Sequence, residues 1–185
     1  MTKRMTDRTA HSRRVRGEEA GMTLIELIVA VLITALLLGA VASLFASGLR
    51  SESATRDRDT ATGAAQVVTE SLHASIRNAA EVIATGNLLR AVVATGSTGW
   101  ECRAWALVGD ELRYRTSAAP IGTDATTWTV LARGVSGTLE GGVPFTNDGR
   151  LVTIGVAVTA GAASVPVTAG VAAQARAEGP VIACW

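Results

Sequence analysis

The chain has 185 residues, of which 48% are hydrophobic, 4% aromatic and 18% charged, and its formal net charge is +1 at pH 7. This length is typical of one domain, and the low charge with a large aliphatic share excludes a charge-driven disordered chain. Beyond residue 50 the arginines are spread singly. Because a phosphate-binding surface needs a concentrated basic stripe, the composition argues against nucleic-acid binding.

The first predicted element is a helix built on the uncharged run from Leu27 to Ala46. These twenty residues would extend about 30 Å as a helix, which matches the hydrocarbon thickness of a bilayer. In lipid the backbone must form its hydrogen bonds within the segment, so the run predicts a transmembrane helix. Arginines precede it, and the positive-inside rule therefore places the N-terminus in the cytoplasm and the rest of the chain outside.

Two interpretations of this run need no further motif. A secretory signal peptide, cleaved after Ala42, is one of them, but its apolar stretch has only about 7–15 residues, and this run is longer. A plain membrane anchor explains the length and the flanking charges. It leaves Glu26 unexplained, because a carboxylate in an apolar segment is costly in a membrane unless it reaches the interface or has a function.

The residues around Glu26 support a third interpretation. The segment EEAGMTLIELIVAVL, residues 18–32, resembles the processing site of type IV prepilins and pseudopilins, with a basic leader, a glycine, a hydrophobic residue and a glutamate at the fifth mature position. The resemblance implies that a prepilin peptidase and methyltransferase cleaves between Gly21 and Met22 and N-methylates Met22. It also implies that the helix is retained and that Glu26 is the acid used in assembly.

The chain after this run predicts more helix and then a sheet. Apolar residues every three or four positions from Val68 to Ile83 predict that the helix continues as an amphipathic one. From Leu88 onward, two-residue alternation and turn residues predict antiparallel strands. We therefore expect an α+β fold, in which a long N-terminal helix, transmembrane in its first half, packs on a C-terminal antiparallel β-sheet, as in pilins. The expected domains are a leader over 1–21, which is removed, a membrane and filament-core helix over 22–49, an amphipathic continuation over 50–85, and a sheet-containing head over 86–185.

The alternation also locates the strands of the head. The clearest inward face combines the alternate residues Val152, Ile154, Val156 and Val158. The stretch ASVPVTAGVAA is expected at an edge, because Pro166 cannot donate to a ladder. The remaining expected strands are LLRAVVAT, WECRAWALV, ELRYR, TTWTVLAR and RLVTIGVAV.

Cys102 and Cys184 are the only cysteines, and both lie in the part expected outside the cytoplasm, where disulfides persist. We expect a bridge between them, with two buried free thiols as the alternative. No metal site is expected, because the chain has only two histidines, one of them in the leader. The four tryptophans are expected in the core, with an exposed sugar- or surface-binding patch as the alternative.

The sequence displays no catalytic motif, so we expect neither an enzyme nor a cofactor. The resemblance implies a structural subunit of a type IV pilus, including one for DNA uptake, or of a type II secretion pseudopilus. Its implied partners are the prepilin peptidase, other pilin or pseudopilin subunits and the cytoplasmic membrane, and its final location is an extracellular filament or pseudopilus. The order W-x-C-x-x-W-x-L-x-x-x-x-L-x-Y over 100–114, followed by W-x-V-L-A-x-G-V over 128–135, is similar to the heads of PilW-type minor pilins and GspJ-like pseudopilins. The sparse, Trp-containing head favours a minor subunit. The rival hypothesis is a membrane-anchored extracytoplasmic binding domain with no filament role.

Overall fold

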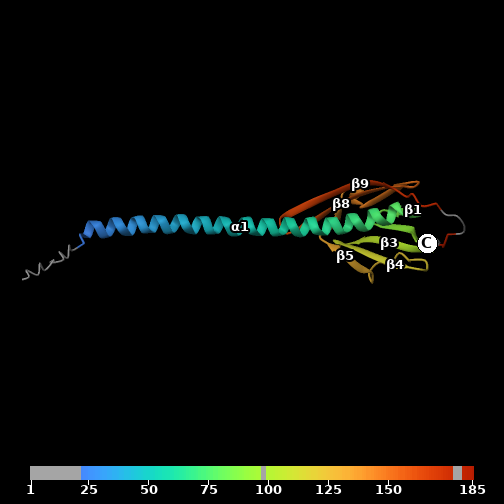
Figure 1. Cartoon of the computed structure of the whole chain (residues 1–185), viewed down its shortest axis with the longest axis horizontal. Helices are drawn as coiled ribbons and strands as arrows, with labels where there is room; N and C mark the ends of the chain where they lie inside the picture. Colours follow the sequence, from blue (N-terminus) through green and yellow to red (C-terminus); the bar gives the residue numbers. More distant parts are fainter. Residues whose placement is uncertain (1–21, 97–98, 177–180) are drawn as a thin grey trace, which may run out of the picture. The chain divides into compact units, whose positions relative to one another are not determined.

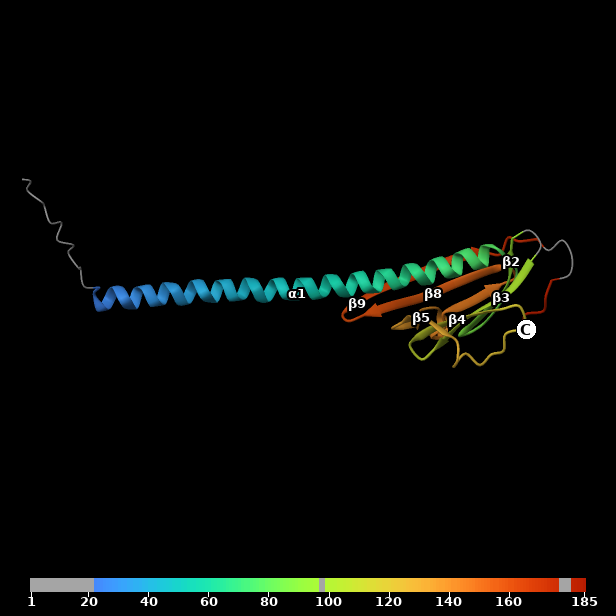
Figure 2. The same cartoon turned by 60° about the horizontal axis from the view of Figure 1, so that its bottom comes forward.

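The computed structural model describes residues 22–96, 99–176 and 181–185 (Figures 1 and 2). The expected leader, including Gly21, lies outside the described residues. The chain divides into two compact units, residues 1–47 and 48–185, and each is described by itself below. The helix α1 (Leu24–Arg77) begins in the first unit and ends in the second.

The strands that follow α1 form two antiparallel sheets, which confirms the α+β fold class. The first sheet has the order β1-β2-β3-β4-β5. Its strands are β1 (Ala79–Thr85), β2 (Leu88–Thr95), β3 (Gly99–Val108), β4 (Glu111–Ser117) and β5 (Thr129–Arg133).

The second sheet is centred on β8 (Leu151–Ala160). One edge of β8 pairs with β6 (Val135–Gly137) and β7 (Phe145–Asp148), and the other edge pairs with β9 (Ala163–Ala172). A short 3-10 helix, η1 (Glu140–Gly142), lies between β6 and β7. A single sheet is expected from the sequence, and that expectation is wrong. After β5 the chain turns at Gly134, which has φ +67°, and enters the second sheet through β6.

The predicted end of the helix is also wrong, because α1 ends at Arg77 and not at residue 85. Asn78 follows it, and the side-chain Nδ2 of Asn78 donates to the carbonyl of Ala74 at 2.8 Å. The next residues include Val82 and Ile83, whose β-branched side chains favour a strand, and they pair with β2 across a turn at Gly86. The head therefore contains strand from Ala79 onward, earlier than the expected boundary at residue 86.

The main hydrophobic core lies between α1 and the two sheets. Figure 1 shows the last part of α1 next to strands of both sheets, with β8 and β9 on one side and β3, β4 and β5 on the other. The helix buries one stripe of its surface there, and β8 buries the alternate face that the sequence predicts. These residues are Ala61, Ala65, Val68, Leu72 and Ile76 of α1 and Val152, Ile154, Val156 and Val158 of β8.

Two polar contacts join α1 to β3 beside this core. The indole Nε1 of Trp105 donates to the hydroxyl of Ser71 at 3.0 Å, and a guanidinium nitrogen of Arg103 donates to the hydroxyl of Ser75 at 2.9 Å. Ser71 and Ser75 are four apart on the helix, while Arg103 and Trp105 are two apart on the strand, so both pairs share one face of each element. These bonds satisfy polar groups at the edge of an otherwise apolar contact.

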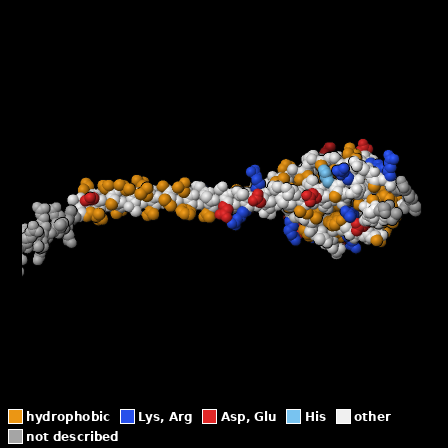
Figure 3. Space-filling model, viewed as in Figure 1, with side chains coloured by type: hydrophobic (Ala, Val, Ile, Leu, Met, Phe, Trp, Pro, Cys, Tyr) orange, Lys and Arg blue, Asp and Glu red, His pale blue; other side chains and the backbone are white. Residues whose placement is uncertain are grey.

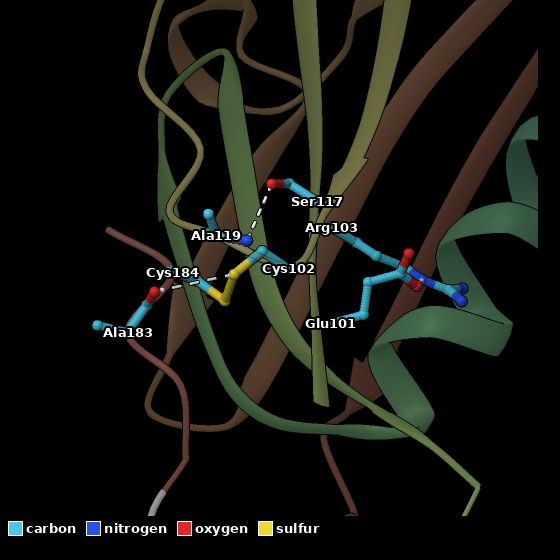
Figure 4. Close-up of a disulfide and its surroundings, with 7 residues drawn as sticks. All are labelled: Glu101, Cys102, Arg103, Ser117, Ala119, Ala183 and Cys184. Atoms are coloured by element: carbon cyan, nitrogen blue, oxygen red, sulfur yellow. Dashed lines mark hydrogen bonds and ion pairs between the residues drawn. A yellow bond between two sulfur atoms is a disulfide. The ribbon is translucent and has the colours of Figure 1, made fainter. Parts of the chain in front are cut away.

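A second hydrophobic cluster covers the other face of the first sheet and contains the disulfide. Cys102 of β3 is bonded to Cys184, as expected, and both residues are buried (Figure 4). The amide of Ile121 donates to the carbonyl of Cys184 at 3.1 Å, so the loop after β4 holds the tail as well. Residues 181–184 thus form part of the cover on this face of the sheet.

The tryptophans follow the expectation only in part. Trp105 and Trp128 are buried, in the first and second cluster respectively. Trp185 is 43% exposed, because it follows Cys184 beyond the edge of the second cluster. Its ring lies under the guanidinium of Arg90, at 5.6 Å from the ring centroid, which is within cation–π distance.

Candidate functional site: the N-terminal apolar segment

The first part of α1 is apolar on all sides. Each residue from Met22 to Arg50 is exposed, and Figure 3 shows hydrophobic side chains along this part of the helix. A helix that is hydrophobic all round belongs in a membrane or inside a larger assembly, and so continuous an apolar surface is rare on a soluble monomer. We call residues 24–47 the apolar segment. Its exposed large side chains are Leu24, Ile25, Leu27, Ile28, Val29, Val31, Leu32, Ile33, Leu36, Leu37, Leu38, Val41, Leu44 and Phe45.

The polar groups within the apolar segment are largely satisfied by the helix itself. The hydroxyl of Thr34 donates to the carbonyl of Ala30 at 2.7 Å, and the hydroxyl of Ser47 donates to the carbonyl of Ser43 at 2.8 Å. Such internal bonds are the ones that a lipid environment requires. The helix is long and apolar enough to cross a membrane, and Glu26 is the one charged residue of the segment.

The start of the helix explains part of the position of Glu26. Thr23 is the N-cap, because its hydroxyl accepts a hydrogen bond from the amide of Glu26 at 3.3 Å and its carbonyl accepts one from Leu27 at 3.1 Å. Thr23 and Glu26 have the spacing of a capping box, in which a threonine is followed three residues later by a glutamate. The predictions from the sequence did not include Thr23, although this spacing ahead of an apolar run is a recognised signal of a helix start.

Glu26 therefore lies in the first helical turn, at the fifth position after the predicted processing point. The partial positive charge of the helix N-terminus stabilises a carboxylate at this position. This stabilisation does not depend on assembly. Met22 precedes α1 and is 66% exposed. The structure thus places Met22 and Glu26 at the same end of the apolar segment, while Gly21 lies outside the described residues.

The described residues of the head form no metal-binding cluster. Among residues 22–96, 99–176 and 181–185, no three His, Cys, Asp or Glu side chains are grouped to hold a metal ion. A hollow of about 450 Å³ beside the β1–β2 turn includes Asp124 in its lining. The carboxylate of Asp124 accepts bonds from the hydroxyl and the amide of Thr126, at 2.6 and 3.0 Å, and these bonds lower the pKa of Asp124. These bonds form a local turn that stabilises the carboxylate.

Comparison with known proteins found one match. Residues 16–42 match the family described as the prokaryotic N-terminal methylation motif. The match includes Gly21, Met22, Glu26 and most of the apolar segment. No curated protein and no solved structure matched the chain.

The match places the type IV pilin and pseudopilin signal at the N-terminus of this chain. The signal indicates a precursor that is processed by a prepilin peptidase. One long apolar N-terminal helix followed by antiparallel sheets is also a pilin-like architecture. The signal and the fold together fit a membrane-anchored, pilin-type protein.

Proposed function

We propose that this protein is a subunit, of the minor class, of a type IV pilus or a type II secretion pseudopilus. The methylation motif ends within an exposed apolar helix that continues into a folded head, and this coincidence carries the proposal. The proposed mature chain begins at Met22 after cleavage next to Gly21. Residues 22–49 serve first as the anchor in the cytoplasmic membrane and later as the filament core, with the head outside.

The proposed role of Glu26 follows from the charge that cleavage creates. A free α-amino group has a pKa of about 7.7–8.0, and monomethylation keeps it a cation, so the new N-terminus is mostly positive near neutrality. In lipid a carboxylate requires such a cation. We assign Glu26 to an ion pair with the methylated Met22 of a neighbouring subunit, which fixes how far one subunit is displaced along the helix of the next.

The proposed partners follow from the processing signal, and the proposed minor class follows from the head. The processing enzyme is a prepilin peptidase and methyltransferase, and the assembly partners are other pilin or pseudopilin subunits. The pattern over 100–114 and 128–135, which is similar to PilW-type and GspJ-like heads, supports the minor class. The Cys102–Cys184 bridge holds the C-terminal tail on the head. Because disulfides persist outside the cytoplasm, the bridge supports an extracytoplasmic head.

Substitutions at Glu26 separate assembly from helix capping. Gln retains the capping-box side chain but removes the charge, whereas Asp retains the charge on a shorter side chain. We expect Glu26→Gln and Glu26→Ala to remain in the membrane and to be processed, but to be lost from sheared filaments or from the pseudopilus fraction, while Glu26→Asp retains part of the wild-type incorporation. Immunoblots of the membrane and filament fractions give the measurement. Normal incorporation of Glu26→Gln would show that the charge is not needed for assembly, whereas absence of the wild-type protein itself from the filament fraction would support the plain-anchor hypothesis.

A further inference from the structure

The second sheet ends in an unpaired edge at β9. Within the described part of the chain, β9 pairs with β8 alone, over its full length of 10 residues and without a bulge. The two-residue turn Gly161-Ala162 closes this hairpin with the pair Ala160–Ala163. Figure 2 shows β8 and β9 as a long hairpin that runs alongside α1.

The register shows which residues present backbone groups to the free edge. In a two-residue hairpin the closing pair exchanges hydrogen bonds, and hydrogen-bonded and open pairs then alternate along the ladder. Pro166 opposes Ala157 in an open pair, which agrees with its lack of an N–H, so the backbone groups of every second residue from Ser164 point away from β8. The residues Ser164, Pro166, Thr168, Gly170 and Ala172 are all exposed, and four of them carry a free-edge N–H.

This edge lacks the usual protection against strand pairing. Natural edge strands are commonly blunted by charge, by a bulge or by a covering loop. The run from Leu151 to Ala175 contains no charged residue, and the exposed side chains of β9 are small. Pro166 is the one blocking residue, and it leaves Thr168, Gly170 and Ala172 open as a continuous stretch.

The first sheet does not present a comparable edge. The amide of Ala84 in β1 donates to the side-chain oxygen of Asn147 in β7 at 2.8 Å, and the carbonyl of Ala79 accepts from Ala175 at 3.1 Å. At the other side, β5 has five residues and continues directly into β6 of the second sheet. The free edge of β9 is therefore the longest and least charged of the head as described.

We infer that the free edge of β9 pairs with β9 of a second copy of this chain. An edge of unpaired backbone donors and acceptors binds another extended strand. Because the side chains beside this edge are small and uncharged, the best-matched partner strand is also uncharged and has small side chains. Within the described residues β9 itself has these properties, and two copies bring no like charges together. Anchoring in one membrane raises the effective concentration of the two heads, which compensates for a small contact. The inference requires the membrane anchor but not filament assembly.

Cysteine cross-linking of the full chain in membranes tests this pairing. A Cβ at Gly170 has room, because its nearest neighbour is the Leu151 side chain at 3.7 Å, so Gly170→Cys introduces an edge thiol without strain. Thr159→Cys supplies an exposed thiol on β8, one strand away from the edge. With the natural cysteines bridged to each other, we expect a short bismaleimide cross-linker, which does not require the two thiols to lie directly opposite each other, to give a covalent dimer of Gly170→Cys and little dimer of Thr159→Cys on a denaturing gel.

A second substitution distinguishes strand pairing from random collision. Thr168→Pro removes an outward N–H without removing a bond to β8, whereas Thr168→Val retains that N–H. In the Gly170→Cys background we expect the dimer to be lost with proline and kept with valine, and to persist when Glu26→Gln is added. Equal dimer from Gly170→Cys and Thr159→Cys, retention with proline, or cross-linking to a different protein in place of a second copy would overturn the inference. Because Glu26→Gln tests filament assembly separately, failure of one proposal is distinguishable from failure of the other.

Discussion

At the residue scale, the contact between Trp105 and Ser71 shows how the helix is positioned on the sheet. The Trp105 side chain is fully buried, and its one polar atom is bonded to Ser71. Its ring also lies 5.3 Å from that of Tyr114, whose pKa is raised chiefly by burial. A large aromatic side chain with a satisfied N–H fixes the rotation of α1 more closely than aliphatic packing does alone.

Removing the acceptor should therefore destabilise the head. Ser71→Ala leaves the indole N–H of Trp105 buried without a partner, and we expect a loss of about 1–3 kcal/mol in the free energy of unfolding. Ser51→Ala, on an exposed part of the same helix, is the control and should change it by no more than about 0.5 kcal/mol. Urea unfolding of the full chain in detergent, followed by tryptophan fluorescence, gives both values. Similar values for the two variants would contradict this role of the hydrogen bond.

At the element scale, the tip of the β8–β9 hairpin is attached to α1. A carboxylate oxygen of Asp57 accepts a hydrogen bond from the amide of Ala162 at 3.1 Å. Gly161 has φ +53°, and a Cβ placed on it would lie 2.1 Å from the same oxygen. At the other end of β9, the amide of Gln174 donates to the carbonyl of Arg77 at 3.1 Å, so the hairpin is held to the helix at both ends.

This attachment predicts that Gly161→Ala is more harmful than an ordinary glycine substitution in a turn. Gly109, at φ +63°, has no atom within 4 Å of a Cβ, so Gly109→Ala incurs only the backbone cost, of about 1–2 kcal/mol. Gly161→Ala incurs this cost and also displaces the Asp57 carboxylate from the amide of Ala162, so we expect a larger fall in the unfolding midpoint from the loss of that hydrogen bond. The excess should disappear in the Asp57→Ala background. An equal effect of the two glycine substitutions would show that the hairpin tip is not held against the helix.

The elements also show what the sequence alone can and cannot predict. β8 was predictable because Val152, Ile154, Val156 and Val158 alternate along it, and β2 was predictable because its short apolar run is bounded by turn residues. The end of α1 was not, since Ile83 continues the four-residue spacing while its pairing with Arg90 depends on a strand nearby in space. β6, with 3 residues, is too short to show a period. At the candidate site the Thr23 cap was predictable from its spacing to Glu26, whereas the closure of the second cluster by the tail depends on long-range packing.

At the scale of the whole molecule, the two units differ in whether their apolar side chains are exposed or buried. Residues 24–47 expose apolar side chains on every side, whereas the described residues after 47 bury most of theirs in two clusters, one of which contains the disulfide. The surface of the first unit suits lipid or the core of an assembly, and the second unit carries the kind of bridge that persists in an oxidising compartment. Processing next to Gly21 would leave both units joined, because it precedes α1. A signal-peptide cleavage after Ala42 would instead remove most of the apolar segment.

The mass of the N-terminal peptide tests this account most directly. The protein would be isolated from membranes of cells that also express a prepilin peptidase, and from matched cells that express an inactive peptidase. We predict a chain that begins with N-methylated Met22 in the first case and an uncleaved leader in the second. A chain that keeps its leader in the presence of the active peptidase would support a plain anchor, and a chain that begins at Ser43 would identify a secreted domain; either result would contradict the account.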